Sequence, residues 1–529
     1  MGKERRMTKK RLEILTVVAI IVLQTVVYSC VASMKGYLHM DEAFSLGLAN
    51  YDKLGIQDEA DFYENWHTGD YYSDYLAVQD DDTFSLAQVY ENQKNDVHPP
   101  LYYVLLRTVM EFDSPDVAMY SGVILNIVIL AFETLLLYLV LRYLFRGATH
   151  YKKKAAVLTL VSMLTFSTMS SMLYIRMYAT VSFLIMLTAY LHLRIKECDG
   201  KSLPLNIIVG AVALIGSLTH YYYLFFLVGI YLVTAIRFII KKQYRPLIIY
   251  TSCMIGAGIL SLLIFPHSIR HMFFGYRGEG FISKLLNVGK LFKGFKEYID
   301  LTCVWIYHSS LTVLILYTVA LRIYAFIRKI DVKIKERGNF LLVLVPMLVY
   351  FFFVSVASPY RDLRYIMPLS ALLFAVPVFY SYELTEKVLG IKLSSVFVSA
   401  LALCMVISPI VTEREPQELW SDHKAFVKSM ENELNLPLLY FHRPENDRFL
   451  DDILIFTKLD NSYVTNDSSF DHDLIREIFK EQDTSGGVLI ILSEDEDRVY
   501  AREQVKAALG KENSKLIKAL NANYLYLIY

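Results

Sequence analysis

Long apolar runs constrain the fold of this chain more than any other feature of its sequence. A helix needs about 20 predominantly apolar residues to cross a membrane. Eleven runs of about this length occur, at roughly 13–34, 116–141, 155–173, 177–194, 204–220, 222–240, 246–265, 302–327, 339–357, 365–382 and 393–411. The chain is 55% hydrophobic with a mean hydropathy of +0.36, too apolar for an ordinary soluble protein. We therefore predict a mainly α-helical, polytopic membrane protein with about 11 transmembrane helices.

Two pairs of these runs are almost continuous, and dividing each pair is an interpretation. Residues 155–194 and 204–240 could each be one long apolar stretch. The division places the polar cluster around Arg176 at one turn and the cluster around His220 at another. Without it, these polar groups would lie in the middle of the membrane, where they are costly.

Basic residues in the short loops predict the orientation. In an eleven-span arrangement the basic segments all fall on one side, at 3–11, 142–154, 194–201, 237–245 and 322–337. That side should be the cytoplasm. The charged N-terminus resembles the start of a signal peptide, but its apolar run is long enough to span and no small-residue cleavage site follows. We expect a retained anchor, a cytoplasmic N-terminus and a multi-pass protein of the cell membrane.

The same arrangement predicts two domains. Residues 1–411 form the transmembrane domain, with 35–115 as a first, acidic extracytoplasmic loop. In 412–529, short apolar runs at 436–441 and 488–492 alternate with polar helical patterns at 471–481 and 496–509. This alternation is typical of a small α/β domain. With an odd number of spans, that domain is also extracytoplasmic.

Charge and cysteine content exclude some classes of protein. The formal net charge is zero, so no overall positive charge argues for nucleic acid as a partner. The five cysteines form neither a disulfide framework nor a CxxC or Cys/His zinc spacing. Membrane lipids are the partner that composition favours.

Residues 281–299 have a pattern different from that of the spans. Their apolar residues recur at helical spacing and lysines take the other faces; the apolar residues are Phe281, Leu285, Val288, Phe292, Phe295 and Ile299, and the lysines are Lys284, Lys290, Lys293 and Lys296. This pattern predicts an amphipathic helix in the membrane interface. A helix packed on an outside domain is the alternative.

Two adjacent acids, Asp41 and Glu42, follow the first apolar run. Two interpretations are open. Asp41 caps a short helix, since Asp is a good N-cap, or it is a catalytic carboxylate held at the boundary between lipid and water. On this stretch alone, the cap is favoured. A further acid, Glu133, lies inside the second run; it is either functional or a hydrogen-bonded structural residue, and we leave it out of the site.

The end of the first loop reads Asn-Asp-Val-His-Pro-Pro-Leu-Tyr-Tyr over residues 95–103. A DE pair soon after the first span, with D-x-H-P-P-L closing the same loop, resembles the GT-C membrane glycosyltransferases. Within them the chain looks most like protein O-mannosyltransferases and their bacterial relatives that use dolichyl- or polyprenyl-phosphate sugars. The resemblance covers about residues 10–411. Tyr102-Tyr103 depart from the eukaryotic continuation, and the sugar-binding-type lumenal domain of those enzymes is not visible.

This resemblance implies a reaction and a set of residues. A hexose or similar sugar would move from a polyprenyl-phosphate donor to an extracytoplasmic lipid, glycan or protein, with inversion. Asp41 would be the general base, with Glu42 as its partner and Asp96 and His98 orienting the acceptor or the base. A positioned base is worth about 10²–10⁴-fold. Fixed positive or donor groups would stabilise the leaving phosphate, and the candidates at outside membrane edges are Arg176, His220, Arg361 and Arg364.

Other function classes stay open. A transporter or lipid flippase would place acids and broken helices near mid-membrane, and Glu133 is the one such acid that we find in the sequence. A non-enzymatic surface or assembly protein would act through 412–529. Asp41 and Asp96 could bind a divalent metal, but no ligand set with recognisable spacing accompanies them. No motif names the sugar or the acceptor.

Overall fold

The computed structural model describes residues 2–78, 85–112, 118–274, 287–430, 433–442, 447–467, 469–494 and 496–529. The chain forms two compact units, each built from separate segments. The membrane unit contains Met1–Ser33, Val97–Tyr102 and Val123–Gln417. The loop–tail unit contains Met34–Asp96, Tyr103–Gly122 and Glu418–Tyr529. The first loop thus clusters with the C-terminal segment and not, as predicted from the sequence, with the transmembrane helices.

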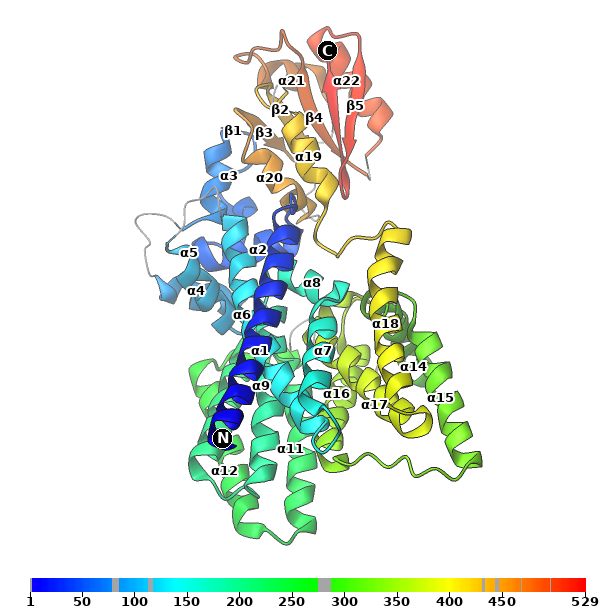
Figure 1. Cartoon of the computed structure of the whole chain (residues 1–529). Helices are drawn as coiled ribbons and strands as arrows, with labels where there is room; N and C mark the ends of the chain where they lie inside the picture. Colours follow the sequence, from blue (N-terminus) through cyan, green and yellow to red (C-terminus); the bar gives the residue numbers. More distant parts are fainter. Residues whose placement is uncertain are drawn as a thin grey trace. The chain divides into compact units, whose positions relative to one another are not determined.

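Long apolar helices build the membrane unit (Figure 1). They are α1 (Gly2–Ala32), α6 (Ala118–Leu144), α7 (Tyr151–Met163), α8 (Phe166–Leu173), α9 (Tyr178–Glu197), α10 (Leu203–Thr219), α11 (Tyr223–Ile240), α12 (Tyr244–Ile264), α14 (Val288–Leu301), α15 (Leu311–Ile327), α16 (Arg337–Ala357), α17 (Ser370–Leu389) and α18 (Ile391–Val411). Short turns of other helix types join them, at η4 (Arg270–Phe274), η5 (Thr302–Ile306), η6 (Leu363–Tyr365) and η7 (Met367–Leu369).

The predicted polytopic helical fold is confirmed, but the count of eleven spans is not. Within the described residues, 7 helices are long and apolar enough to cross a membrane, or up to 9 if each bent pair is one span. The bent pairs are α7 with α8, at 58°, and the helix up to Ile306 with α15, at 100°. The two remaining predicted runs correspond to α10 and α18. At 17 residues, α10 rises about 26 Å, which is less than the roughly 30 Å hydrocarbon core.

Apolar side chains on the outside of the membrane unit suit a lipid surrounding. Ile255 and Leu263 on α12 and Phe326 on α15 are exposed. In water such a surface would be a binding patch, whereas lipid covers it without cost. Inside the unit, Glu133 of α6 is buried and accepts a hydrogen bond from the Ser182 hydroxyl at 2.7 Å. This contact agrees with the interpretation of Glu133 as a hydrogen-bonded structural residue.

Short helices and one sheet build the loop–tail unit. From the first loop come α2 (Met40–Asn50), η1 (Ile56–Asp58), α3 (Gly69–Leu76), α4 (Leu86–Asn95) and most of α5 (Leu101–Met110). From the tail come α19 (Ser421–Ser429), η8 (Asp447–Asp452), α20 (Ile453–Phe456), α21 (His472–Ile478) and α22 (Arg498–Leu509). The predicted small α/β domain is confirmed, because strands and helices alternate through the tail.

The sheet has six strands in the order β1-β3-β2-β4-β6-β5. They are β1 (Trp66–His67), β2 (Leu438–Phe441), β3 (Ser462–Thr465), β4 (Val488–Ser493), β5 (Ser514–Ala519) and β6 (Asn523–Ile528). β2 pairs in parallel with β3 and β4, and the other pairs are antiparallel. Every residue of β2 and β4 is buried, as expected for central strands covered on both faces.

One strand of this sheet comes from the first loop. Trp66 and His67 of β1 pair with Tyr463 and Ser462 of β3, and the Trp66 indole N–H donates to the Ile478 carbonyl at 3.1 Å. A sheet cannot extend through a bilayer between its strands, since backbone groups in lipid must be satisfied locally. The first loop and the tail therefore lie on the same side of the membrane, and the chain between them crosses an even number of times.

The predicted amphipathic helix overlaps α14. Phe281, Lys284 and Leu285 lie outside the described residues. Within α14, Phe295 packs against Phe351 of α16 at 5.5 Å between ring centroids, and the Tyr298 hydroxyl donates to the Ser358 hydroxyl at 2.8 Å. Phe292 is exposed. The helix is amphipathic as predicted and packs on the membrane unit; its place in the interface stays a prediction.

Candidate functional site

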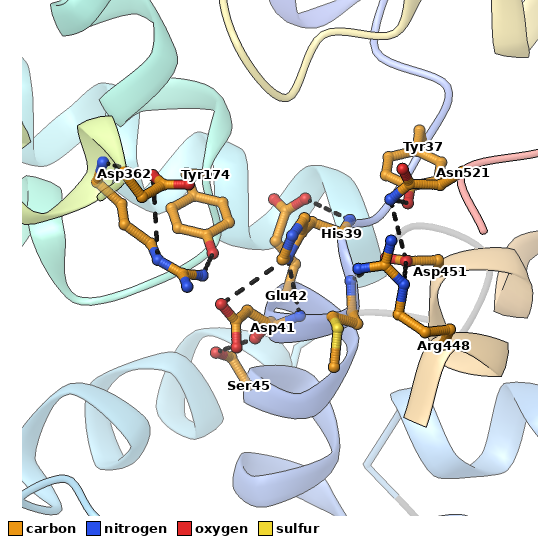
Figure 2. A network of polar contacts seen from close by, with 12 residues as sticks. Tyr37, His39, Asp41, Glu42, Ser45, Tyr174, Asp362, Arg448, Asp451 and Asn521 are labelled. Carbon is orange, nitrogen blue, oxygen red and sulfur yellow. Dashed lines mark hydrogen bonds and ion pairs between the residues drawn. The ribbon is translucent and has the colours of Figure 1, made fainter. Parts of the chain in front are cut away.

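The helix that carries the two acids, α2, has a different N-cap residue from the one that the sequence suggests. His39, not Asp41, is the N-cap of α2: its Nδ1 accepts the Asp41 N–H at 3.1 Å. The Glu42 carboxylate completes a capping box by accepting the His39 N–H at 2.9 Å (Figure 2). The interpretation of Asp41 as the helix cap is therefore wrong. Asp41 occupies the second helical position, where its charge suits the positive end of the helix.

Glu42 is held in a buried ion pair. The Lys35 ammonium lies 3.0 Å from Glu42 Oε2, and both side chains are fully buried. Lys35 also donates to the Glu418 carbonyl at 2.8 Å, so it links the start of α2 to the tail. These contacts make Glu42 part of the scaffold around the helix start.

Asp41 has a different environment from its neighbour. Its side chain is 23% exposed, and Oδ2 lies 3.8 Å from His39 Nδ1. Asp41 is thus the member of the DE pair with a carboxylate that is neither buried nor part of the cap.

A carboxylate of the tail, which sequence reasoning missed, holds the same helix start. Asp451 of η8 is buried, and its Oδ1 accepts the Met40 N–H at 2.7 Å, satisfying one of the unpaired donors of the first turn. Its Oδ2 accepts from Asn521 Nδ2 at 3.1 Å and lies 3.3 Å from Arg448 Nε (Figure 2). The signal in the sequence was an Asp-Asp pair directly between the apolar residues Leu450 and Ile453.

The second acid of that pair, Asp452, is buried in surroundings that favour its protonated form. Burial raises the pKa of the Asp452 carboxyl to about 8, with the nearby Asp451 adding to the shift. Asn523 Nδ2 donates to Asp452 Oδ2 at 2.6 Å. Asp451 is the acid of the pair that contacts the start of α2.

In the membrane unit, histidine and tyrosine rings form a cluster at the predicted outer edge. The rings of His98 and His220 lie 5.9 Å apart, and His220 also contacts Tyr178 at 5.8 Å and Tyr222 at 5.0 Å. His220 Nδ1 accepts the Tyr222 N–H at 3.0 Å, so the ring proton is on Nε2 and the ring is a hydrogen-bond donor there. Tyr365 contacts both Tyr178 and Tyr222.

Arg364 borders this ring cluster. Its guanidinium lies over the Tyr365 ring at 5.2 Å and donates to the Tyr174 hydroxyl at 3.0 Å. Asp362 caps η6 by accepting the Arg364 N–H at 2.9 Å and lies 4.0 Å from Arg364 Nε. Arg176 is buried, and the rings of Tyr174 and Tyr178, which flank it in sequence, stack at 5.8 Å. The structure thus brings His98, His220 and Arg364 into one network of aromatic contacts.

Arg361 has other partners. Its Nε donates to Glu297 of α14 at 3.0 Å, and a second nitrogen donates to the Ser358 hydroxyl at 2.8 Å. With Lys290 and Lys293 it lines a cavity of about 270 Å³. Although Arg361 is only three residues from Arg364, it contacts Glu297 and Tyr298 of α14 and Ser358 after α16.

Asp96 is the residue that ends α4. Its N–H donates to the Asn92 carbonyl at 3.0 Å, and the Asn92 side chain donates to the Leu48 and Tyr51 carbonyls at the end of α2. Asp96 and Asp41 therefore belong to one unit in which α4 packs on α2. Among the described residues, no group of three or more His, Cys, Asp or Glu side chains is placed to hold a metal ion.

A cavity of about 390 Å³ lies beside the DE segment within the loop–tail unit. Its lining includes Leu38, three residues before Asp41, and the four lysines Lys35, Lys424, Lys428 and Lys458, but no carboxylate. Gly36 allows this arrangement, because a Cβ there would lie 2.5 Å from the backbone nitrogen of Lys424. The cavity is suited to an anionic group.

Comparisons with known proteins give matches among solved structures. No protein-family model matches the sequence, and no match to a curated protein was found. ArnT from Cupriavidus metallidurans bound to undecaprenyl phosphate matches with 11% identity and a TM-score of 0.46 over 97% of each chain. The apo state of the same protein matches with 12% identity and a TM-score of 0.48, again over 97% of each chain.

An archaeal protein matches as well. The oligosaccharyltransferase AglB from Archaeoglobus fulgidus, in complex with an inhibitory peptide and a dolichol-phosphate, has 9% identity and a TM-score of 0.41. The match covers 94% of this chain and 72% of that one. Identities and TM-scores of this size assign neither a substrate nor a site residue to this chain.

Proposed function

We propose that this chain is an integral-membrane glycosyltransferase that moves a sugar from a polyprenyl-phosphate donor to an extracytoplasmic acceptor, with inversion. Asp41 is the general base that removes the proton from the acceptor hydroxyl. Glu42, Lys35, His39 and Asp451 are positioning residues that hold the helix carrying it. The sugar is a hexose or a similar ring.

The observation that carries this proposal is the division of roles between the two acids. Glu42 is fully buried and paired with Lys35, and His39 is the cap. Asp41 therefore neither caps the helix nor belongs to the buried ion pair, and it sits in the first turn of a tightly held helix. A general base must be ionised, accessible and fixed in place, and Asp41 has the exposure and the rigid backbone that this requires.

The leaving phosphate is assigned to the membrane unit. Arg364 supplies a permanently charged guanidinium, and His220 supplies an Nε2–H donor whose orientation its own backbone bond fixes. Groups fixed before the reaction stabilise developing charge without reorganising. His98 and Arg176 complete this set, and Arg361 is the weakest member because Glu297 already pairs with it.

Deleting the gene and analysing cell-surface glycans by mass spectrometry tests the function directly. We expect one glycan to lose a single sugar, and the wild-type gene but not the Asp41→Asn gene to restore it. In membranes containing the protein, a panel of undecaprenyl-phosphate-linked hexoses identifies the donor through release of free undecaprenyl phosphate. An unchanged glycan profile together with no release from any donor would contradict the proposal.

The orientation has its own test. The proposal requires 35–115 and 412–529 to lie outside the cytoplasm, and the positive loops support this side. Ser469 is exposed in the tail, so Ser469→Cys, with the five native cysteines replaced, should react with a membrane-impermeant maleimide in intact cells. A cysteine at Lys201, in a predicted cytoplasmic loop, is the control and should react only after lysis. The opposite pattern would invert the orientation.

A further inference from the structure

A second amphiphilic cavity lies within the membrane unit, among α7, α17 and α18. Its volume is about 300 Å³. One part of its lining is basic, with His150, Lys153 and Lys154, and the rest is mainly apolar; no carboxylate lines it. The proposed glycosyltransferase function uses none of these residues, so the cavity needs its own explanation.

The basic part of the cavity is the first turn of α7. Three consecutive lysines, at 152–154, occupy this turn, where the helix end is already partly positive. Lys152 is paired with Glu13 at 2.5 Å, and Lys154 with Glu386 of α17. For Lys153, which is exposed, no carboxylate partner occurs among the described residues. The turn therefore keeps a net positive charge that an anion would balance.

Lys154 gives this turn a fixed geometry. Its side chain is almost fully buried, and its ammonium lies 4.9 Å from the centre of the Tyr382 ring and 6.0 Å from that of Phe145. A cation held between a carboxylate and two aromatic rings does not move freely. The neighbouring Lys153 thus extends from a rigid helix start.

The apolar part of the cavity opens toward the lipid-facing surface. Val157 of α7 and Ile391 of α18 line it and are 48% and 42% exposed. Leu158 and Val378 form the buried wall behind them. In a membrane, exposed apolar side chains on spanning helices contact acyl chains. The cavity therefore joins a basic end to an apolar path along two helices.

We propose that this cavity binds an anionic phospholipid. The phosphate lies against Lys153 and the first turn of α7, and an acyl chain follows Val157 and Ile391. Basic pockets between transmembrane helices are known to suit anionic headgroups. The inference rests on the membrane helices alone and not on the proposed glycosyltransferase function.

Native mass spectrometry of the full-length protein, purified in detergent and titrated with single lipids, tests this. We expect the first bound dioleoyl phosphatidylglycerol to be retained about tenfold more strongly than dioleoyl phosphatidylcholine, as for one charge-assisted contact. Lys153→Ala should remove most of that preference and Lys153→Arg should keep it. Lys201→Ala, at an exposed lysine outside the cavity, is the matched control and should leave the preference unchanged.

Three outcomes would overturn the proposal. One is equal retention of the two lipids by the wild type. Another is a preference that survives Lys153→Ala, which would place the lipid elsewhere on the surface. The third is displacement of phosphatidylglycerol by millimolar inorganic phosphate alone, which would identify the ligand as a free phosphate and not a lipid. A Val157→Asp variant adds an independent measurement, since a charge on the apolar path should weaken lipid retention while Lys153 stays in place.

Discussion

Asp41→Asn is expected to lower sugar transfer by about 10²-fold or more while leaving the fold intact. Asn has the shape of Asp but lacks the basic oxygen, and a positioned general base contributes about 10²–10⁴-fold. Because His39 caps α2, the substitution removes no cap, and the loss of a negative charge at the helix N-terminus costs about 0.3–1 kcal/mol. Turnover and thermal stability of the purified protein, measured side by side, check both parts.

Asp70→Asn is the matched control. Asp70 is also the second residue of a helix in the loop–tail unit, after the N-cap Thr68 of α3, and it is exposed. The small change in stability should be similar in the two variants, and only Asp41→Asn should lose turnover. Binding of undecaprenyl phosphate, the leaving group of the reaction, should not change in either. Full turnover in Asp41→Asn would remove Asp41 from the reaction.

The second prediction with a large expected effect concerns the free energy of unfolding. Lys35→Met removes the ammonium group from a fully buried ion pair with Glu42. Removing one partner of such a pair typically costs about 3–5 kcal/mol, because the remaining charge stays buried. The loss of the bond to the Glu418 carbonyl adds to this. Thermal or denaturant unfolding of the purified protein should therefore show a large loss of stability.

A surface pair of the same unit provides the comparison. Lys94 and Glu91 are 3.1 Å apart and have side chains that are 41% and 56% exposed. Exposed pairs contribute roughly 0–1 kcal/mol, so Lys94→Met should change stability little. Similar losses in Lys35→Met and Lys94→Met would mean that the pair at the start of α2 is not a structural anchor.

The helices of the membrane unit were predictable because their signal is local. An apolar run of about 20 residues has few alternatives to a helix in lipid, since every backbone group must be satisfied within the segment. The strands β2 and β4 were predictable for a similar reason, as short apolar runs between turns. The number of spans could not be predicted in this way. A helix of about 17 residues, such as α10, can be either a span or a shorter buried helix.

The arrangement around Asp41 depends on contacts that no local pattern contains. Asp451 is 411 residues from Met40 in sequence, and it fixes where the extended chain ends and α2 begins. With the helix beginning at Met40, His39 is the N-cap and Asp41 lies inside the helix. The sequence favoured Asp as the cap because that residue type is common there. Likewise, the pairing of Arg361 with Glu297 could not be read from two residues on separate helices.

The contribution of a first-loop strand to the C-terminal sheet sets an order for biosynthesis. At about 5–20 residues per second, the ribosome needs roughly 20 to 80 s to reach Asp451 after it has made Met40. During that interval β1 has no strand to pair with and the start of α2 is without its tail partner. A nascent chain in this state exposes an open sheet edge to chaperones and proteases. A premature stop between α18 and η8 would keep every membrane helix but remove Asp451, so the DE helix of such a truncated membrane protein would lack its support from the tail.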